Sequence, residues 1–562
     1  MRARIRSLIQ ELRRRRVFRA AGVYIVGAFA ALQGASVLVP ALHLAEWTMT
    51  FLVVLALVGF PVAMGLAWVF DVVPDRDAGR LRLEETAVAD AARRAEPLPR
   101  IRDSSGPRCV AVVPFLNLST DPENEIFVDG VTEDVIAQLS KIRALKVIAR
   151  TSVMPFKTRE RSLREIGALL GATTLLDGSV RRIGDRVRIV AQLVDAQTEQ
   201  QLWAETYDRQ LTDIFAIQSD VALQIAQALE TELSVDEQDR IRKEPTRSIA
   251  AYQLYLQGRQ AFLRFTTDGF ERAIEYFARA LAGDPAYALA HVGMAMAYAE
   301  LVENGVLAPD IGRPRALQAA DQALRLDPGL ADAHCARAHL KSLWEFDWHE
   351  AEAGFQRAIA LNPNSADAHD LYGRMWAAQQ RYDDALVLQR RAQELDPLAH
   401  RLDVATTLLR AGRYAEAEAE TARAVDFEPE YARAHATLGW AQFKQGNTAQ
   451  GLASLERAVT LSPQDTQWLA QLGQARALAG DAEGARAVLH QLEDRARSGY
   501  VTPYHFAFVY TGLGEHDRAL EFLEHALEER AGAIYAIKGS FLFAPLREYA
   551  GFKALLARLN LH

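Results

Sequence analysis

Six prolines recur at nearly equal spacing in the second half of this 562-residue chain, and they constrain its fold more than any other feature. The gaps between them are 43, 35, 34, 32 and 34 residues, because they lie at Pro285, Pro328, Pro363, Pro397, Pro429 and Pro463. Small or aromatic side chains precede them at helical spacing, as in Ala351, Phe355 and Ala358. This spacing places three side chains on one face of a helix, and proline stops the helix. We therefore predict about eight helical pairs over residues 249–530.

A helix–turn–helix period of about 34 residues, with small residues such as Gly373, Gly439 and Gly473 in the first helices, resembles the tetratricopeptide repeat (TPR). The resemblance implies an all-α solenoid, since one helical pair cannot bury its own apolar face. It also implies that the concave face binds protein or peptide partners. Residues 531–562 are predicted to form a helix that caps the open end of the solenoid. The long first gap predicts a loop inserted at 302–313.

The first 73 residues combine an arginine-rich N-terminus with two apolar runs, at about 20–42 and 47–73. Each run exceeds the roughly 20 residues that cross a bilayer, which predicts a hairpin of two transmembrane helices in contact with lipid. Arginines flank the runs but are absent from the link between them. The positive-inside rule then predicts a multi-pass inner-membrane protein whose N-terminus and C-terminal domains are cytoplasmic, with periplasmic C-terminal domains as the alternative. Residues 74–107 are predicted to be a linker.

Residues 108–235 have the pattern of a small α/β domain. Short apolar runs alternate with amphipathic stretches, and Gly184-Asp185 between two alternating segments predicts a hairpin. The predicted order β-α-β-α-β-β-β-α implies a sheet with helices packed on it. The whole chain is therefore predicted to be multidomain, with a transmembrane hairpin, an α/β domain and a helical solenoid.

Three segments of the α/β region, Val110–Phe115, Asp121–Glu125 and Leu202–Arg209, carry a second resemblance. They are similar to the domain related to the N-terminal part of TolB and to the FlgO-like domain, which implies a bacterial protein and a binding or assembly role. Longer relatives often carry a cyclase or a DNA-binding domain ahead of it, whereas only the predicted hairpin stands there in this sequence. We expect a membrane-anchored, non-catalytic scaffold. The alternative is a signalling sensor whose α/β domain binds a ligand and modulates a cyclase- or transcription-type partner.

Six residues of the solenoid are candidates for partner binding. Four histidines recur six residues after a proline, and two tryptophans lie in the aromatic stretch 344–350; they are His291, His334, His369, His435, Trp344 and Trp348. The histidines either hold a packing position of the repeat or form a polar ladder that contacts a partner. Neighbouring ladder members cannot share a metal ion, because packed helices lie about 8–10 Å apart. The tryptophans either pack within their turn or anchor a partner.

No catalytic residue, cofactor or metal site is predicted. Six acids cluster at the start of the α/β domain, at Asp121, Glu123, Glu125, Asp129, Glu133 and Asp134. Carboxylates of this kind hold Mg²⁺ or act in acid–base catalysis, but they are also favoured at a helix N-terminus, and no phosphate-binding loop or histidine is near. Beyond residue 102 the net charge is about −14, which argues against a nucleic-acid partner. Cys109 and Cys335 support neither a disulfide framework nor a zinc site.

Overall fold

The computed structural model describes Trp47 and residues 108–119, 121, 124–304, 306–531 and 533–561. The chain divides into two compact units, Met1–Glu96 and Pro97–His562, and all the helices and strands given below belong to the second unit. The predicted linker at 74–107 and, apart from Trp47, the predicted spans at 20–42 and 47–73 lie outside the described residues.

The predicted inner-membrane location, with its cytoplasmic or periplasmic domains, is corrected by the structure. In the part of the chain that is described, no helix is long and apolar enough to cross a bilayer. The longest described helix, α13 (Pro309–Leu326), has 18 residues and carries charged side chains along its length, among them Asp310, Arg315 and Asp321. A multi-pass inner-membrane protein is therefore not supported.

A small mixed sheet forms the first described domain. Strand β1 (Cys109–Val112) runs parallel to β3 (Lys146–Val147) on one side and to β4 (Thr174–Ile183) on the other. Strands β5 (Arg186–Asp195) and β6 (Gln201–Gln210) then extend the sheet antiparallel, and the short β2 (Leu116–Asn117) pairs with β4. The β4–β5 hairpin turns at Gly184, whose φ of 59° is readily adopted by glycine.

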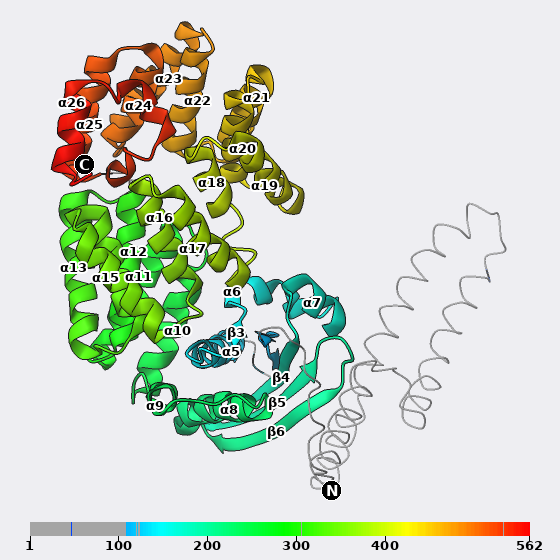
Figure 1. The fold of residues 1–562 in the computed structure, drawn as a ribbon. Helices are drawn as coiled ribbons and strands as arrows, with labels where there is room; N and C mark the ends of the chain where they lie inside the picture. The colour runs from blue at the N-terminus through cyan, green and yellow to red at the C-terminus, as the bar shows by residue number, and fades with distance from the viewer. Residues whose placement is uncertain are drawn as a thin grey trace, which may run out of the picture. The chain divides into compact units, whose positions relative to one another are not determined.

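Two helices of the domain, α5 (Asn124–Ser140) and α8 (Ile214–Ala228), contact each other and the strands (Figure 1). Their apolar faces meet the buried sheet residues, and Leu139 and Ile217 are part of the same core as Val110. The other helices of this domain are short: α6 (Arg150–Val153), α7 (Leu163–Leu170) and α9 (Val235–Arg242). Helix α7 begins at a capping box in which Ser162 and Glu165 satisfy each other's backbone N–H groups.

The second described domain is all-helical and consists of consecutive helical pairs. The first helices of the pairs are α10 (Ile249–Phe262), α12 (Ala288–Glu303), α14 (Ala331–Leu340), α16 (Ala366–Ala378), α18 (Asp403–Arg410), α20 (Ala432–Lys444), α22 (Thr466–Leu478) and α24 (Pro503–Leu513). The second helices are α11 (Thr267–Gly283), α13, α15 (Trp348–Leu361), α17 (Tyr382–Leu395), α19 (Tyr414–Phe427), α21 (Thr448–Leu461), α23 (Ala482–Ala496) and α25 (His516–Glu529).

The repeated alanines and aromatics hold these pairs together, since Ala273, Phe277 and Ala280 of α11 are all fully buried. Phe277 packs against Gly258 and Gly293, where an added Cβ would lie about 2.5 Å from the ring. Only glycine allows this close approach. The loop predicted at 302–313 is mostly helical, because α12 extends to Glu303 and α13 begins at Pro309.

The C-terminal segment, residues 531–561, differs from the single capping helix predicted there. It consists of two 3₁₀ turns, η4 (Ile534–Ala536) and η5 (Phe541–Leu546), followed by α26 (Ala550–Arg558). Pro545, which lacks a backbone N–H, lies within η5. Helix α26 contacts α25, but the segment also returns to earlier repeats: Tyr382 donates its hydroxyl to the carbonyl of Gly539 at 3.1 Å.

Candidate functional site: a charged inner surface of the solenoid

The first helices of the repeats contact one another in succession from α10 to α20. Charged side chains from these helices face a common space, although they come from different repeats. Arg259 of α10 interacts electrostatically with the carboxylates of Asp332 on α14 and Asp367 on α16. We name this region the charged inner surface and define it by Arg259, Asp332, Asp367, Asp370, Arg374, Asp403 and Arg433.

Three of these residues occupy equivalent positions in their repeats. Asp332, Asp367 and Arg433 each lie four residues after the proline of the preceding turn. Asp332 and Asp367 are exposed, and the side chain of Asp367 keeps 84% of its accessible surface. Among the described residues, no lysine or arginine lies within ion-pair distance of either carboxylate. Asp332 therefore carries a negative charge without an ion-pair partner among these residues, whereas the only charged group within ion-pair distance of Asp367 is the imidazole of His400.

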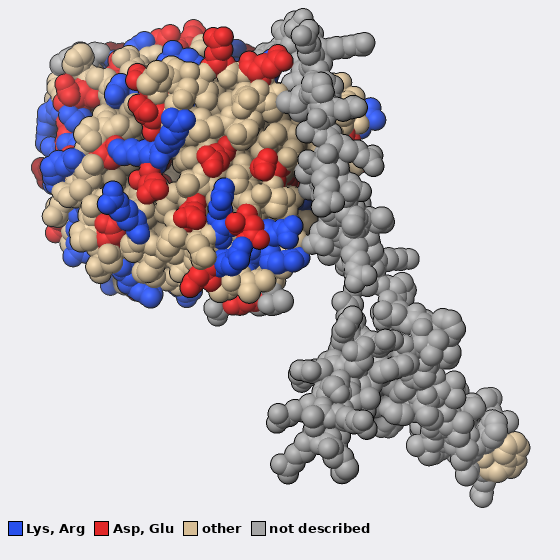
Figure 2. Space-filling model, turned by 90° about the horizontal axis from the view of Figure 1, so that it is seen from below, with Lys and Arg blue, Asp and Glu red and all other residues tan. Residues whose placement is uncertain are grey.

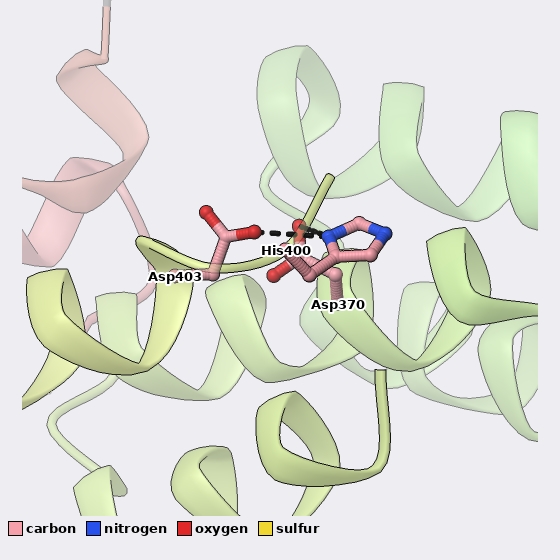
Figure 3. Close-up of side chains that lie close together, drawn as sticks. All are labelled: Asp370, His400 and Asp403. Atoms are coloured by element: carbon pink, nitrogen blue, oxygen red, sulfur yellow. Dashed lines mark hydrogen bonds and ion pairs between the residues drawn. The ribbon is translucent and has the colours of Figure 1, made fainter. Parts of the chain in front are cut away.

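A buried cluster lies beside these exposed acids and contains Asp370 of α16, His400 of the α17–α18 turn and Asp403 of α18. In Figure 3 the three side chains point toward one another. The Nδ1 atom of His400 lies 2.9 Å from Oδ2 of Asp403 and 3.9 Å from Oδ2 of Asp370. The other ring nitrogen, Nε2, lies 3.5 Å from Oδ1 of Asp367. All three residues of the cluster are less than 9% exposed.

The charges in this cluster shift one another's protonation. Burial and the neighbouring Asp403 carboxylate raise the pKa of Asp370 to about 7. Burial would also raise the pKa of Asp403, but Arg433, which donates to its Oδ1 at 2.7 Å, and His400 hold it well below its usual value. For His400, burial is outweighed by the neighbouring carboxylates of Asp367, Asp403 and Asp370, so its pKa lies well above the usual range.

The Asp370 carboxylate is unusual because it accepts no hydrogen bond from any of the described residues. Its Oδ1 atom is fully buried without a partner. Buried polar atoms are almost always satisfied, so each exception needs an explanation such as water or an ion. The sequence pattern does not indicate this cluster, because Asp370 and His400 are 30 residues apart and His400 is not one of the four recurring histidines.

A shortened repeat places His400 in the cluster. Helix α18 has 8 residues, whereas α16 and α20 each have 13, so residues 396–402 form a turn where other repeats begin their first helix. The gap between Pro397 and Pro429, 32 residues, is the shortest of the series. That short gap is the one sequence signal that could have drawn attention to this turn.

The sheet domain contacts the same turn and the turn before it. Asn364, between α15 and α16, donates its side-chain amide to the carbonyl oxygens of Ser140, Ile142 and Leu145, at 2.9 to 3.3 Å. It also accepts a hydrogen bond from the backbone N–H of Val147 at 3.3 Å. These four bonds fix the end of α5 and strand β3 on the solenoid.

The acids of α5, predicted to lie at a helix N-terminus or on the surface, instead form specific pairs. Glu133 lies 2.7 Å from Arg259 of α10 and 3.2 Å from Arg150. Asp134 accepts hydrogen bonds from the hydroxyl of Tyr252 and from Gln218. These contacts connect the sheet domain to the first repeat. Two arginines therefore pair with Glu133, and a tyrosine and a glutamine donate to Asp134.

The histidine ladder has a local role in each repeat. The Nε2 atoms of His291, His334 and His435 lie 3.2, 2.8 and 2.8 Å from the carbonyl oxygens of the prolines six residues earlier. His369 instead contacts the carbonyl of Ser365 through Nδ1, at 2.8 Å. These bonds close the turn before each first helix. Contact with a partner stays a prediction for all four histidines.

The two tryptophans of the stretch 344–350 have different environments. Trp344 lies in a π-helical turn, η3 (Lys341–Glu345), and is buried in the hydrophobic core. Trp348 is partly buried and donates its indole N–H to the carbonyl of Leu559 in the C-terminal segment, at 2.9 Å. No result tests whether either side chain contacts a partner, so that role also stays a prediction.

The face of the molecule seen in Figure 2 carries a mixture of charges. Lysine and arginine side chains are interspersed there with aspartate and glutamate, without an extended area of one sign among the described residues of that face. The exposed carboxylates of Asp332 and Asp367 on the charged inner surface, which have no lysine or arginine partner among the described residues, are therefore a more distinctive feature than this face.

Comparison with known proteins identifies the repeats. Residues 347–400, 402–466 and 436–500 match the family described as tetratricopeptide repeat. The part of the solenoid between residues 347 and 500 is built of tetratricopeptide repeats. The protein named "Putative adenylate cyclase 3" from Rhizobium meliloti (strain 1021) is 37% identical over 259 residues, which cover 46% of this chain and 43% of that protein. This chain thus spans less than half the length of that relative.

Solved structures of repeat proteins also resemble the chain. A tetratricopeptide repeat protein from Parabacteroides merdae covers 47% of this chain over its full length, with 17% identity and a TM-score of 0.35. YrrB, described as a TPR protein with an unusual peptide-binding site, covers 34% of this chain with 95% of its own length, at 22% identity and a TM-score of 0.25. The match to the TolB and FlgO-like domains is not among these findings.

Proposed function

We propose that the charged inner surface binds a protein or peptide partner and that the chain is a non-catalytic scaffold. The observation that carries this proposal is the pair of exposed carboxylates, Asp332 and Asp367, at equivalent positions in adjacent repeats and without a lysine or arginine partner among the described residues. Packed helices lie about 8–10 Å apart. That separation matches about three residues of an extended peptide, which advances about 3.3 Å per residue.

The chemistry of the surface favours a partner with basic residues. Arg259 and Arg433 are already paired, with Glu133 and with Asp403. Asp332 and Asp367 are left to attract lysine or arginine side chains of a partner. Such charges increase the rate of encounter and select the partner, while packing of apolar groups supplies most of the affinity.

The sheet domain is assigned a binding or assembly role in this proposal. Its resemblance to the TolB N-terminal and FlgO-like domains supports that role, as does its attachment to the solenoid through Asn364. The hydrogen bonds of Asn364 hold the sheet domain in one position against the repeats. A domain fixed in this way adds a second surface next to the charged inner surface.

The test compares two exposed aspartates. The immobilised full chain captures partners from a lysate of the source organism, and the captured protein is then purified and titrated against each variant. Asp367→Arg should weaken binding at least tenfold. Asp383→Arg, at a position on α17 whose side chain is 98% exposed, should leave it unchanged. Equal binding by both variants, or equal loss in both, would contradict the proposal.

A signalling regulator is the second candidate. The cyclase name of the Rhizobium meliloti relative favours it, and so does the turn at 396–402, which contacts both the sheet domain and the buried cluster. In this case the sheet domain binds a ligand and changes how the solenoid engages a cyclase-type partner. A ligand that raises the melting temperature of the full chain and alters partner affinity would support the regulator.

A further inference from the structure

We propose that Asp370, His400 and Asp403 bind one first-row divalent cation, Zn²⁺ or Mn²⁺. One ligand atom from each of the three residues lies within 4.8 Å of the other two. Ligands at about 2.0–2.2 Å from a tetrahedral zinc ion are roughly 3.3 Å apart. The observed separations from Nδ1 of His400, 2.9 Å to Asp403 and 3.9 Å to Asp370, lie on either side of this value. Small side-chain rotations are enough to form the site.

The atoms outside the cluster orient two of the ligands. Metal-binding histidines usually donate their second ring N–H to a carboxylate, and metal-binding carboxylates are themselves hydrogen-bonded. His400 has Asp367 at its Nε2, which leaves Nδ1 for the ion. Asp403 receives Arg433 at Oδ1, which leaves Oδ2 for the ion. Both free ligand atoms face the same point.

The unpartnered carboxylate of Asp370 is the independent observation that points to a ligand. This side chain is only 7% exposed, and its Oδ1 atom has no hydrogen-bond partner. In Figure 3 its oxygens lie between His400 and Asp403. A buried carboxylate costs free energy unless it is paired or coordinates a metal ion. A cation at this point would satisfy it.

The ligand set and the local charge select the kind of cation. Imidazole nitrogen suits zinc and similar transition metals, whereas Mg²⁺ and Ca²⁺ prefer oxygen alone. Three carboxylates, of Asp367, Asp370 and Asp403, face two arginines, Arg374 and Arg433, so the surroundings carry a net negative charge when His400 is neutral. A divalent ion replaces the proton shared between His400 and Asp403, and that proton is released.

This site goes beyond partner binding because it acts on the fold. The ion would join α16 to the turn at 396–402 and thereby cross-link the fourth and fifth repeats. Because the backbone N–H of Leu398 in this turn donates to the hydroxyl oxygen of Ser152, the position of the sheet domain would depend on the occupied site. Binding of the cation would therefore change the structure of the chain, and this change can be measured without any partner.

The test uses the full chain without an affinity tag, after removal of metals with a chelator. Titration with ZnCl₂ or MnCl₂ followed by calorimetry should show one site, and Asp370→Asn and His400→Gln should each weaken it at least about 100-fold. Asp383→Asn, at an acid on α17 whose side chain is 98% exposed, should bind as the wild type does. Absence of binding by the wild type, equal affinity of Asp370→Asn, or equal loss in Asp383→Asn would each overturn the proposal.

A spectroscopic measurement on the wild type covers the case in which the variants fail to fold. X-ray absorption of the zinc-loaded chain should show only nitrogen and oxygen ligands at about 2.0–2.2 Å. Cys335, whose thiol interacts electrostatically with Asp370, is a competing ligand that this experiment can distinguish. A sulfur ligand at about 2.3 Å would overturn the assignment to Asp370, His400 and Asp403.

Discussion

Ser152 of the sheet domain donates its hydroxyl to the carboxylate of Asp396 in the solenoid, at 2.5 Å, although 244 residues separate them. The Ser152 oxygen also accepts the N–H of Leu398 at 3.0 Å, and both residues are close in sequence to His400. The turn that supplies a histidine to the buried cluster is therefore also a docking point for the sheet domain. A change in the position of this turn would therefore alter both the buried cluster and the contact between the two domains.

Replacement of Asn364 should weaken that junction. Asn364→Ala removes the amide that donates to the carbonyls of Ser140, Ile142 and Leu145 and accepts from the N–H of Val147, and of these groups Ile142 keeps a second donor, the N–H of Leu145. Each buried group left unsatisfied costs about 1–3 kcal/mol, so we expect a loss of roughly 3 kcal/mol in the free energy of unfolding. Urea denaturation followed by circular dichroism measures it.

The matched control for this substitution is Asn447→Ala, at an exposed residue whose side chain makes no capping hydrogen bond. It should change stability by less than about 0.5 kcal/mol. Equal losses in the two variants would show that the asparagine at 364 does not fix the sheet domain on the repeats.

The contact between Asp134 and Tyr252 predicts a pH-dependent junction. Burial, with a further contribution from Glu133, raises the pKa of Asp134 to about 7, well above the value near 4 of the unfolded chain. The folded state holds the proton more tightly, so this stabilisation is complete below about pH 4 and is lost as the pH rises through 7. Between pH 5 and 7.5 the wild type should lose roughly 2–3 kcal/mol relative to Asp134→Asn.

The asparagine variant is the right reference because its amide oxygen still accepts the Tyr252 hydroxyl. Thermal unfolding of both proteins across this pH range provides the comparison. Parallel curves would show that Asp134 is ionised throughout the range, and a wild type that gains stability with rising pH would reverse the predicted sign.

The solenoid could be predicted from the sequence because its determinants are local and repeated. Each proline ends a second helix, and Ala351, Phe355 and Ala358 recur at one helical face, so one unit predicts the next. The mixed sheet was likewise recognisable, since Val187, Ile189 and Leu193 of β5 are buried and alternate with more exposed residues. In both domains the periodic pattern of apolar residues predicts the secondary structure and the buried face.

The candidate site could not be predicted in the same way, because it depends on contacts across the chain. Asp370 and His400 come together only because the turn at 396–402 replaces the start of a helix. The acids of α5 were expected at a helix end or on the surface, but Glu133 meets Arg259, 126 residues away. A periodic pattern describes which face is buried, whereas such ion pairs depend on how the domains pack.

The histidine ladder should contribute to stability in the absence of any partner. His334→Ala removes the bond between the ring and the Pro328 carbonyl, and a single hydrogen bond contributes about 1 kcal/mol. His490→Ala, at an exposed histidine on α23, is the control and should change stability by less than about 0.5 kcal/mol. If the two variants melt at the same temperature, the four recurring histidines have no structural role, and the prediction that they contact a partner is favoured.

The C-terminal segment should detach when Gly539 is enlarged. A Cβ at this position would lie 2.2 Å from the carbonyl oxygen of Ala377 on α16, and backbone atoms cannot move aside as a flexible side chain can. Gly539→Ala should therefore disrupt the contacts of Tyr382 and Gln380 with the segment, at a cost of about 2 kcal/mol or more. Gly499→Ala, where a Cβ meets nothing within 4 Å, is the control. Hydrogen exchange should increase in residues 533–549 of the first variant alone, whereas unchanged protection there would show that the segment is held by α25 and α26 instead of by α16.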